Sequence, residues 1–332
     1  MKAFAYQVAT SEEHAASLLG EKAVALAGGT NLLNLMKSYV VQPDTVVSIT
    51  RLPGSSKIEA IDGGLKLGAN VRLVDIAESP DVRKLYRALA EAADNVASPQ
   101  IRHMGTLGGN LCQRPYCWYF TQEGFDCLKR GGTTCPAKDG DNEFHAVLGT
   151  DGPCVATHPS SLAPALVALD AKVRIVGPKG AREIPVEELF VLPKVDPKRE
   201  TVLAPNEIVT HVILPAPTAR PLSATYEVRS KEANDWPLSV ASVALKVEGG
   251  LCVDSRIALG AVAPVPWRSK EAEEALKGKP LNEASAAAAA DLALKGAAPL
   301  SRNAYKVKTA HTALRRAILA AASPAAASSP PK

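Results

Sequence analysis

Cysteine is the residue whose placement first points to chemistry in this chain. The 332 residues contain six cysteines, and five of them fall within 43 consecutive positions: Cys112, Cys117, Cys127, Cys135 and Cys154. Their spacing, C-x4-C-x9-C-x7-C-x18-C, lacks the recurring tight pairs of zinc fingers and the C-x2-C-x2-C run of ferredoxins. Four soft thiolates on an irregular loop would still suit a tetrahedral zinc or an iron–sulfur cluster. A chance gathering of free thiols is the alternative, and the crowding argues against it.

Two Gly-Gly loops offer a second kind of chemistry. One is Ala27-Gly28-Gly29-Thr30-Asn31, between an expected strand and an expected helix, and the other is Thr106-Leu107-Gly108-Gly109-Asn110. Backbone N–H groups at a helix start can hold an anion such as a pyrophosphate. An ordinary strand-to-helix turn, with Thr30 or Asn31 as N-cap, is the simpler interpretation. Neither loop matches G-x-G-x-x-G or the P-loop pattern, so a Rossmann or P-loop site is not supported.

The elements expected around these loops mix strands and helices. Strands are predicted at 22–27, 44–49, 172–176, 208–214, 239–247 and 253–262, with a hairpin formed by 57–61 and 65–67. Helices are predicted at 32–36, 162–169, 269–276, 283–294 and 304–322, with a helical region at 73–95 that Pro80 breaks. Between them, 98–154 is rich in Gly and Pro and reads as loop, and a loop this long is usually functional.

Composition excludes several classes of protein. Hydrophobic residues make up 46% and charged residues 22% of the chain, which excludes collagen-like, coiled-coil and mostly disordered proteins. The net charge of +4 comes without a long basic run, so we expect no nucleic-acid partner. No apolar stretch reaches the ~18 residues of a membrane span, and no signal-peptide core follows the N-terminus. Without such a signal we expect a reducing compartment. Clustered thiols in a reducing compartment more often bind metals or do redox chemistry than form disulfides.

The glycine loops and later segments together resemble a known family. Ala27 to Leu32 is similar to one flavin loop of the FAD-binding subunits of molybdenum hydroxylases, the xanthine dehydrogenase and carbon monoxide dehydrogenase type. Thr106 to Asn110 is similar to their second loop, which usually reads T-I-G-G-N. Residues 207–215 resemble the strand before their C-terminal domain, and 237–262 with 301–319 resemble that domain itself. The resemblance covers nearly the whole chain apart from its tail.

This resemblance implies an α+β fold with two domains. The first is an FAD-binding domain of the vanillyl-alcohol-oxidase (PCMH) type at 1–220, with one lobe at about 1–55 and a second at about 56–220 that carries a Cys-rich iron–sulfur loop at 111–155. The second is a CO-dehydrogenase-flavoprotein-type α+β domain at 221–322. Pro-rich punctuation at 193–221 favours a boundary there. The Ala/Ser/Pro-rich tail 323–332 is expected to be disordered.

The resemblance also implies an FAD site. Its cofactor contacts carry over to Leu26, Ala27, Gly28, Gly29, Thr30, Asn31, Leu32, Leu33, Asn34, Thr106, Gly109, Asn110, Ser161 and Lys231. Two positions depart from the family pattern. The family often has Ser-Asp where this chain has Ser160-Ser161, and a lysine after the aromatic at Tyr226, where this chain has Glu227. No catalytic side chain is expected, because the cofactors carry the difficult chemistry.

The cysteine-rich insert resembles one branch of that family, which holds an extra [4Fe–4S] cluster and includes the bacterial three-subunit aldehyde oxidoreductases. In this comparison the cluster ligands carry over to Cys117, Cys127, Cys135 and Cys154. Cys112 occupies a position that varies in the branch and is treated as a non-ligand thiol. Cys252 lies in an apolar strand context and is expected to be a small buried hydrophobe.

The function that the resemblance implies is that of an electron-transfer oxidoreductase subunit. A large partner subunit with a molybdenum cofactor hydroxylates an aldehyde or related substrate, a small [2Fe–2S] partner passes the electrons to this FAD, and an external acceptor receives them. The complex is a heterotrimer or its dimer, located in the cytoplasm or co-exported to the periplasm on a partner's twin-arginine signal. Two alternatives stay open: a self-sufficient FAD oxidase or reductase of the same fold, and a zinc-stabilised scaffold protein without redox activity.

Overall fold

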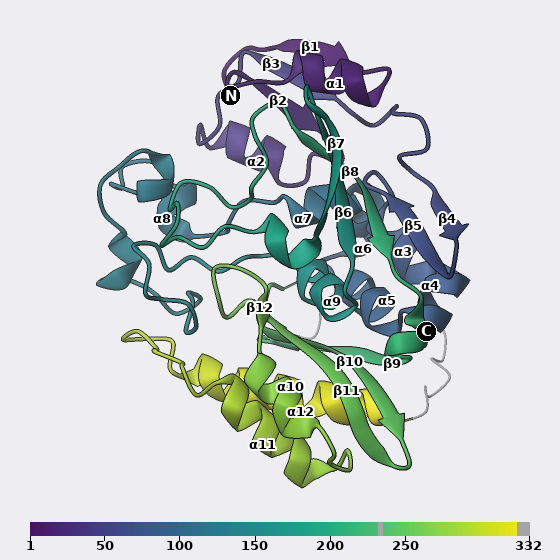
Figure 1. The fold of residues 1–332 in the computed structure, drawn as a ribbon. Helices are drawn as coiled ribbons and strands as arrows, with labels where there is room; N and C mark the ends of the chain where they lie inside the picture. Colours follow the sequence, from purple (N-terminus) through teal and green to yellow (C-terminus); the bar gives the residue numbers. More distant parts are fainter. Residues whose placement is uncertain (232–234, 324–332) are drawn as a thin grey trace.

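A computed structural model describes residues 1–231 and 235–323, and three sheets organise this part of the chain (Figure 1). The first sheet is parallel, in the order β1-β3-β2. Its elements are β1 (Ala5–Val8), α1 (Glu12–Leu18), β2 (Ala23–Leu26), α2 (Leu32–Lys37) and β3 (Thr45–Ser48). Val47 on the central strand packs with Ala15 of α1 and with Ile208 of the second sheet, so this small lobe shares a core with its neighbour.

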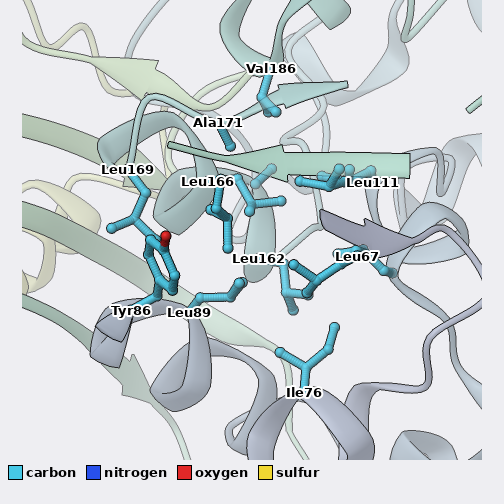
Figure 2. Packing of buried hydrophobic residues seen from close by; sticks show 14 of the residues in the cluster. Leu67, Ile76, Tyr86, Leu89, Leu111, Leu162, Leu166, Leu169, Ala171 and Val186 are labelled. Atoms are coloured by element: carbon cyan, nitrogen blue, oxygen red, sulfur yellow. The ribbon is translucent and has the colours of Figure 1, made fainter. Parts of the chain in front are cut away.

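The second sheet is antiparallel and has the order β4-β5-β8-β6-β7. Its strands are β4 (Ile58–Ile61), β5 (Gly64–Gly68), β6 (Lys172–Gly177), β7 (Gly180–Pro185) and β8 (Ile208–Leu214). Its helices are α3 (Leu73–Glu78), α4 (Pro80–Leu85), α5 (Arg87–Asp94), α6 (Pro99–Met104), α7 (Leu107–Leu111) and α9 (Leu162–Ala168). Figure 2 shows the core between them, where Leu67, Ile76, Leu89 and Leu162 meet. This core fixes α7 and α9, which flank the cysteine-rich stretch.

The cysteine-rich segment, residues 112–161, has little regular structure. It contains α8 (Trp118–Thr121) and two short 3-10 turns, Leu128–Arg130 and Pro136–Lys138. In Figure 1 the α8 region lies at one side of the molecule, next to α2. Small apolar clusters hold it, one of which joins Leu35 of α2 to Phe120 and Cys127. The segment therefore packs against the first lobe as well as continuing the second.

The third sheet is antiparallel, in the order β12-β11-β10-β9. Its unit consists of β9 (Leu222–Arg229), β10 (Pro237–Glu248), β11 (Leu251–Gly260), β12 (Trp267–Arg268), α10 (Lys270–Leu276), α11 (Glu283–Ala293) and α12 (Tyr305–Ala322). Because side chains alternate across a strand, Val243 and Leu245 belong to the core shared with α12, whereas Ala244 belongs to the core shared with α9. The sheet is thus buried on both faces.

The sequence predicted most of these elements. The strand and helix patterns at 22–36, 44–49, 57–67 and 162–176 all correspond to observed elements, and Pro80 does separate α3 from α4. The prediction of loop throughout 98–154 is wrong at its start, where α6 and α7 form. Ser98 and Thr106 each accept a hydrogen bond from the first turn of these helices, which supports segments too short for a periodic pattern.

Strands β1, β7, β9 and β12 and helix α1 were not predicted. All of β7 except Ile184 is exposed, so it carries no alternating pattern. The domain boundaries near 55, 220 and 322 stay predictions. The tail that was expected to be disordered lies, apart from Ser323, outside the described residues.

Candidate cofactor site

The first glycine loop packs against the residues that lead directly into the second. Gly28 packs against the backbone of Met104, at the end of α6, so that a Cβ at position 28 would collide with the Met104 carbonyl. Gly29 has a φ of +76°, in the left-handed region that L side chains rarely adopt. Leu26 and Leu33 lie close to this glycine. Glycine at both positions therefore allows the first loop to turn and to approach the second.

The second loop begins helix α7. Thr106 is its N-cap, and its hydroxyl accepts a hydrogen bond of 3.2 Å from the Gly109 N–H. Asn110 accepts a 2.5 Å hydrogen bond from the Ser160 hydroxyl, which also accepts one from the Ala163 N–H at 3.0 Å. The loop is thereby fixed to the start of α9.

Two cavities follow the loops. The larger, about 380 Å³, is called the loop cleft, and the smaller, about 230 Å³, is called the aromatic cleft because Tyr116 and Trp236 line one side of it. Predicted site residues that line the loop cleft are Ala27, Gly28, Gly29, Thr30, Asn31, Leu32, Thr106 and Gly109. Those that line the aromatic cleft are Thr30, Asn31, Asn34, Thr106, Gly109, Asn110 and Ser161. The two clefts share four of these residues, so the clefts are continuous with each other along both loops.

Three predicted residues do not line either cleft. Leu26 and Leu33 lie beside Gly29, and Leu33 is exposed there. Lys231 instead lines an open groove of about 590 Å³ with Arg229, Lys308 and other residues of β9 and α12. The structure therefore separates Lys231 from the residues of the two loops.

Ser161 and Glu227 are the two departures from the family pattern, and the structure brings them together. Glu227 is 2% exposed at its side chain and lies beside the Ser161 hydroxyl. Its Oε2 accepts a 2.7 Å hydrogen bond from Arg229, while burial raises the pKa of the carboxyl. Because Ser161 lines the aromatic cleft, the buried Glu227 carboxyl lies next to a residue of the cleft wall.

Asn31 connects the first loop to the cysteine-rich segment. Although Asn31 precedes α2 as its N-cap residue, its side chain makes no capping hydrogen bond. Its Oδ1 accepts from the Arg114 N–H at 3.1 Å, and its Nδ2 donates to the Arg114 carbonyl at 3.4 Å. The expectation of a side-chain N-cap at Asn31 is therefore wrong, because the partner is a backbone unit 83 residues away.

Glu200 is a residue that sequence reasoning missed. Its carboxylate accepts from Arg114 at 3.1 Å and from Lys129 at 2.9 Å, and the Lys129 side chain is only 5% exposed. The Arg114 guanidinium also lies over the Phe120 ring, 4.5 Å from its centroid. An isolated glutamate in a Pro-rich stretch gives no sequence signal for such a role, since its partners lie more than 70 positions earlier.

The four predicted ligand thiols lie near enough to influence one another. Cys135 accepts a hydrogen bond from Cys154, which lowers the pKa of Cys135 to about 6 and, together with burial, raises that of Cys154. Burial raises the pKa of Cys117 to about 11, and the charges of Cys127 and Cys135 act on it in the same direction. Within 1–231 and 235–323, no three His, Cys, Asp or Glu side chains are grouped so that they could hold a metal ion. The thiols supply soft donors, which is the chemistry that iron or zinc requires, but not a finished coordination shell.

The other two cysteines lie apart from these four thiols. Cys112 lines the loop cleft, and burial raises its pKa to about 12. Cys252 is buried on β11 within the core of the C-terminal unit.

A histidine not assigned from the sequence contacts one of the thiols. His145 Nε2 lies 3.2 Å from Cys117 Sγ, and burial lowers the pKa of this imidazole to about 4. The start of α12 holds the backbone around it, because Asn303 donates to the carbonyls of His145 and Ala146 at 3.1 Å. The buried Lys306 donates to the Phe144 carbonyl at 3.0 Å. The C-terminal unit thus fixes the cysteine-rich segment on its other side.

Comparison with known proteins identifies the class to which this architecture belongs. The model of the FAD binding domain in molybdopterin dehydrogenase matches residues 2–217, and that of the CO dehydrogenase flavoprotein C-terminal domain matches residues 224–321. The chain therefore belongs to the family of FAD-binding medium subunits of the molybdenum hydroxylases. Both the recognition made from the two glycine loops and the α+β fold expected from it are confirmed.

Among its relatives, the aldehyde oxidoreductase FAD-binding subunit PaoB of Escherichia coli is 37% identical over 95% of this chain and 96% of PaoB. The carbon monoxide dehydrogenase medium chain of Hydrogenophaga pseudoflava is 28% identical over 96% of both chains. A solved structure of carbon monoxide dehydrogenase from that organism superposes with a TM-score of 0.75 at 29% identity, covering 96% of each chain. Quinoline 2-oxidoreductase from Pseudomonas putida 86 gives the same TM-score at 26% identity, with 97% and 98% covered. The chain is an oxidoreductase subunit that binds FAD.

The structure bears on one further expectation from the sequence. Across the part of the chain that is described, none of the helices combines the length and the apolar character needed to cross a bilayer.

Proposed function

We propose that this chain is the FAD- and [4Fe–4S]-binding electron-transfer subunit of a molybdenum-containing aldehyde oxidoreductase. The observation that carries the proposal is the continuity of its parts: the two clefts along the glycine loops adjoin the segment that bears the four thiols. Asn31 and Arg114 link these parts by two hydrogen bonds. The relative named as an aldehyde oxidoreductase FAD-binding subunit supports the substrate class.

The residues of the clefts fit FAD. The pyrophosphate needs backbone N–H donors that can be approached closely, and the Gly28-Gly29 turn has no side chain there to block it. Thr106 and Gly109 would close the opposite side, and Asn110 is held in place by Ser160. The aromatic cleft offers Tyr116 and Trp236 as flat surfaces for a ring system. When bound, FAD supplies the step between paired and single electron transfers.

The four thiols Cys117, Cys127, Cys135 and Cys154 would hold the iron–sulfur cluster. Lys129 is buried, and its charge partly opposes the rise in the pKa of Cys154, so it would also favour thiolate donors. Interactions link the four thiols to one another, since Cys135 is hydrogen-bonded to Cys154 and Cys117 is close enough to Cys127 and Cys135 to feel their charges, so a cluster could use all four as ligands. Hydrogen bonds and nearby cations would then set the reduction potential.

The partners follow from the same proposal. A large subunit would hold the molybdenum cofactor, and a small subunit with [2Fe–2S] centres would deliver the electrons. An external acceptor would remove them from the flavin. The relatives named as medium chains and medium subunits support such an assembly. We place the complex in the cytoplasm, or in the periplasm through a partner's export signal.

A cofactor analysis tests this proposal. The chain is produced with its genetic neighbours, purified without oxygen, and assayed for flavin, iron, sulfide and zinc alongside its visible spectrum. We expect about one FAD and about four irons with four sulfides per chain. A colourless protein containing zinc would contradict the proposal and favour the scaffold alternative. Turnover of a substrate by the isolated chain would instead favour the self-sufficient flavoenzyme.

Cys127→Ser examines the ligand set. This variant is expected to lose most of its iron while it keeps its FAD, because the clefts do not include Cys127. Cys252→Ser is the matched control, since Cys252 is also buried but lies in the core of the C-terminal unit. Full iron content in Cys127→Ser would remove this residue from the ligand set.

A further inference from the structure

Asn70 is a buried polar side chain in the wall of the loop cleft, and the resemblance to the flavin subunits does not assign it a role. It follows β5 and is 6% exposed. Its Nδ2 donates to the Ile49 carbonyl at 2.6 Å and to the Ser55 hydroxyl at 3.0 Å. The Ser55 hydroxyl donates its own proton to the Leu52 carbonyl at 2.7 Å, so it can only accept from Asn70. Both amide protons are therefore used, and these partners fix which end of the amide is the nitrogen.

The other end of this amide, Asn70 Oδ1, is buried and has no hydrogen-bond partner among the residues that the structure describes. The turn around it supplies no donor, because the backbone N–H groups of Ala69, Asn70 and Val71 all donate to the carbonyls of other residues. An unpaired buried acceptor destabilises a protein unless a ligand or water brings a donor to it. Asn70 therefore presents an acceptor at the wall of the cleft for which the chain itself offers no partner.

The rest of the cleft restricts the chemistry of the group that brings this donor. Arg114 is the only cation among the described residues that line the cleft, and Glu200 already accepts from it at 3.1 Å. The Glu207 carboxylate also lines the cleft, and Arg182 pairs with it at 2.9 Å. Apolar side chains complete the wall, among them Val24, Ile49, Leu203 and Val209. Such a wall suits an uncharged ring that carries an N–H donor, whereas a phosphate beside Asn70 would meet a further acceptor.

We propose that Asn70 selects the base of the dinucleotide, because its Oδ1 accepts a hydrogen bond from the amino group of the FAD adenine in the loop cleft. This inference rests on the placement of FAD in the two clefts under the proposed function. The Gly28-Gly29 turn is then left for the pyrophosphate, and the aromatic cleft is left for the flavin ring. Asn70 would thus be a specificity-determining residue in addition to the predicted FAD contacts of the two loops.

Deaminated FAD, in which hypoxanthine replaces adenine, is the probe, because a ring carbonyl stands where the amino group was. The complete complex is freed of its flavin and titrated with FAD or with this analogue. The change in flavin fluorescence gives the Kd of each, so the measurement does not depend on turnover. We expect the analogue to bind about tenfold or more weakly than FAD, since two acceptors would face each other at Asn70.

The ratio of these two dissociation constants locates the contact. Asn70→Ala and the larger Asn70→Leu both remove Oδ1, and each is expected to bring the ratio close to one. Both also remove the bonds to Ile49 and Ser55, but any loss that this causes affects FAD and the analogue alike and cancels in the ratio. Ser55→Ala is the matched control, because it removes one partner of Nδ2 and leaves Oδ1 in place. It should keep the ratio of the unsubstituted protein.

Two results would overturn the inference. Equal affinities for FAD and the analogue in the unsubstituted complex would mean that Asn70 Oδ1 binds water only. This comparison needs no variant, so it decides even if substitution of Asn70 prevents folding. A ratio that is unchanged in both Asn70 variants would assign the selection to another group of the cleft. A complex that is purified without flavin and binds neither form would contradict the proposed function itself, which is a different outcome from equal affinities.

Discussion

Asn31 shows how a side chain assigned to a cofactor by resemblance can have a structural partner. Both of its polar atoms are hydrogen-bonded to the backbone of Arg114. The loop can then offer FAD its backbone N–H groups and the Thr30 hydroxyl rather than the Asn31 side chain. The glycine pattern was sufficient to locate the loop, because it depends on local backbone geometry. The Asn31 partner could not be predicted, because it depends on how a distant segment folds back.

Gly28→Ala tests the contact between the loops. An added methyl group would collide with the Met104 carbonyl, so the first loop and the end of α6, just before the second loop, must move apart. We expect FAD affinity to fall at least about tenfold, or ~1.4 kcal/mol, as measured by flavin retention during dialysis and by titration of the flavin-free protein. Gly20→Ala is the control, because that position has open space and no positive φ. Unchanged affinity in Gly28→Ala would show that the loop contact does not shape the site.

Lys306 gives the chain a pH dependence. Burial lowers its pKa from about 10.5 to about 7 in the folded protein. Between these values the unfolded chain binds more protons than the folded one, so the free energy of unfolding rises with pH. The cost of burying the charge is greatest below pH ~7 and disappears above pH ~10.5. Burial and the Lys306 charge lower the pKa of His145 to about 4, so this neighbouring imidazole does not titrate within the window.

We therefore expect urea unfolding of the protein between pH ~7 and ~9 to gain about 1 kcal/mol per pH unit relative to Lys306→Met. Comparing the two proteins cancels groups that titrate in both. Lys308→Met, an exposed lysine in the same helix, should keep the slope of the unsubstituted protein. Equal slopes in the protein and in Lys306→Met would mean that Lys306 is neutral or charged in both states alike.

At the scale of elements, the cysteine-rich segment depends on three attachments. The first loop holds it through Asn31, Glu200 binds two of its cations, and the start of α12 binds the backbone around His145. The sequence indicated that something other than a hydrophobic core must order this stretch. It could not indicate these attachments, since each joins positions far apart in the chain. Conversely, α6 and α7 were missed because capping residues, rather than periodicity, define them.

Glu200→Gln tests the second attachment. Removing the carboxylate leaves the buried Lys129 without its anion, and breaking such a pair costs about 3–5 kcal/mol when it is fully desolvated. Because Glu200 is partly solvated, we expect a loss of about 1–3 kcal/mol, expressed as faster hydrogen exchange within 112–135. Glu188→Gln is the control, since Glu188 is exposed and has no ion pair among the described residues. Exchange that is unchanged in Glu200→Gln would assign the order of this segment to its apolar clusters instead.

At the scale of the whole molecule, the C-terminal sheet connects the C-terminal unit to the part of the chain that carries the glycine loops. Its β9 and β10 hydrogen-bond at register positions such as Ala244 with Ser223, and Ser223 in turn accepts from the Ala88 N–H of α5. Thr225 donates to the Ala88 carbonyl at 2.9 Å. The alternating apolar pattern predicted the strands, but the sheet is covered on both faces. The face toward α9 carries small residues such as Ala244, and the face toward α12 carries larger ones such as Leu245. This difference indicates two covered faces only once the layers that pack on each face are known.

Ala244→Phe tests whether this face determines how the halves fit. Ala244 is 1% exposed in the core shared with α9, and a phenyl ring there would force the layers apart or into strained rotamers. Overpacking of this kind costs about 1–3 kcal/mol, so we expect a lower melting temperature. FAD should be lost with it, because Ser160, which holds Asn110, and Ser161, which lines the aromatic cleft, directly precede α9.

Ala298→Phe, at an exposed position in the same unit, controls for the added hydrophobic surface and should keep both properties. A lower melting temperature with full FAD content in Ala244→Phe would show that the flavin clefts tolerate displacement of the C-terminal sheet. Loss of FAD at a higher rate than loss of structure would show the opposite. In that case the packing of the third sheet, which lies outside both glycine loops, controls the cofactor site through the position of α9.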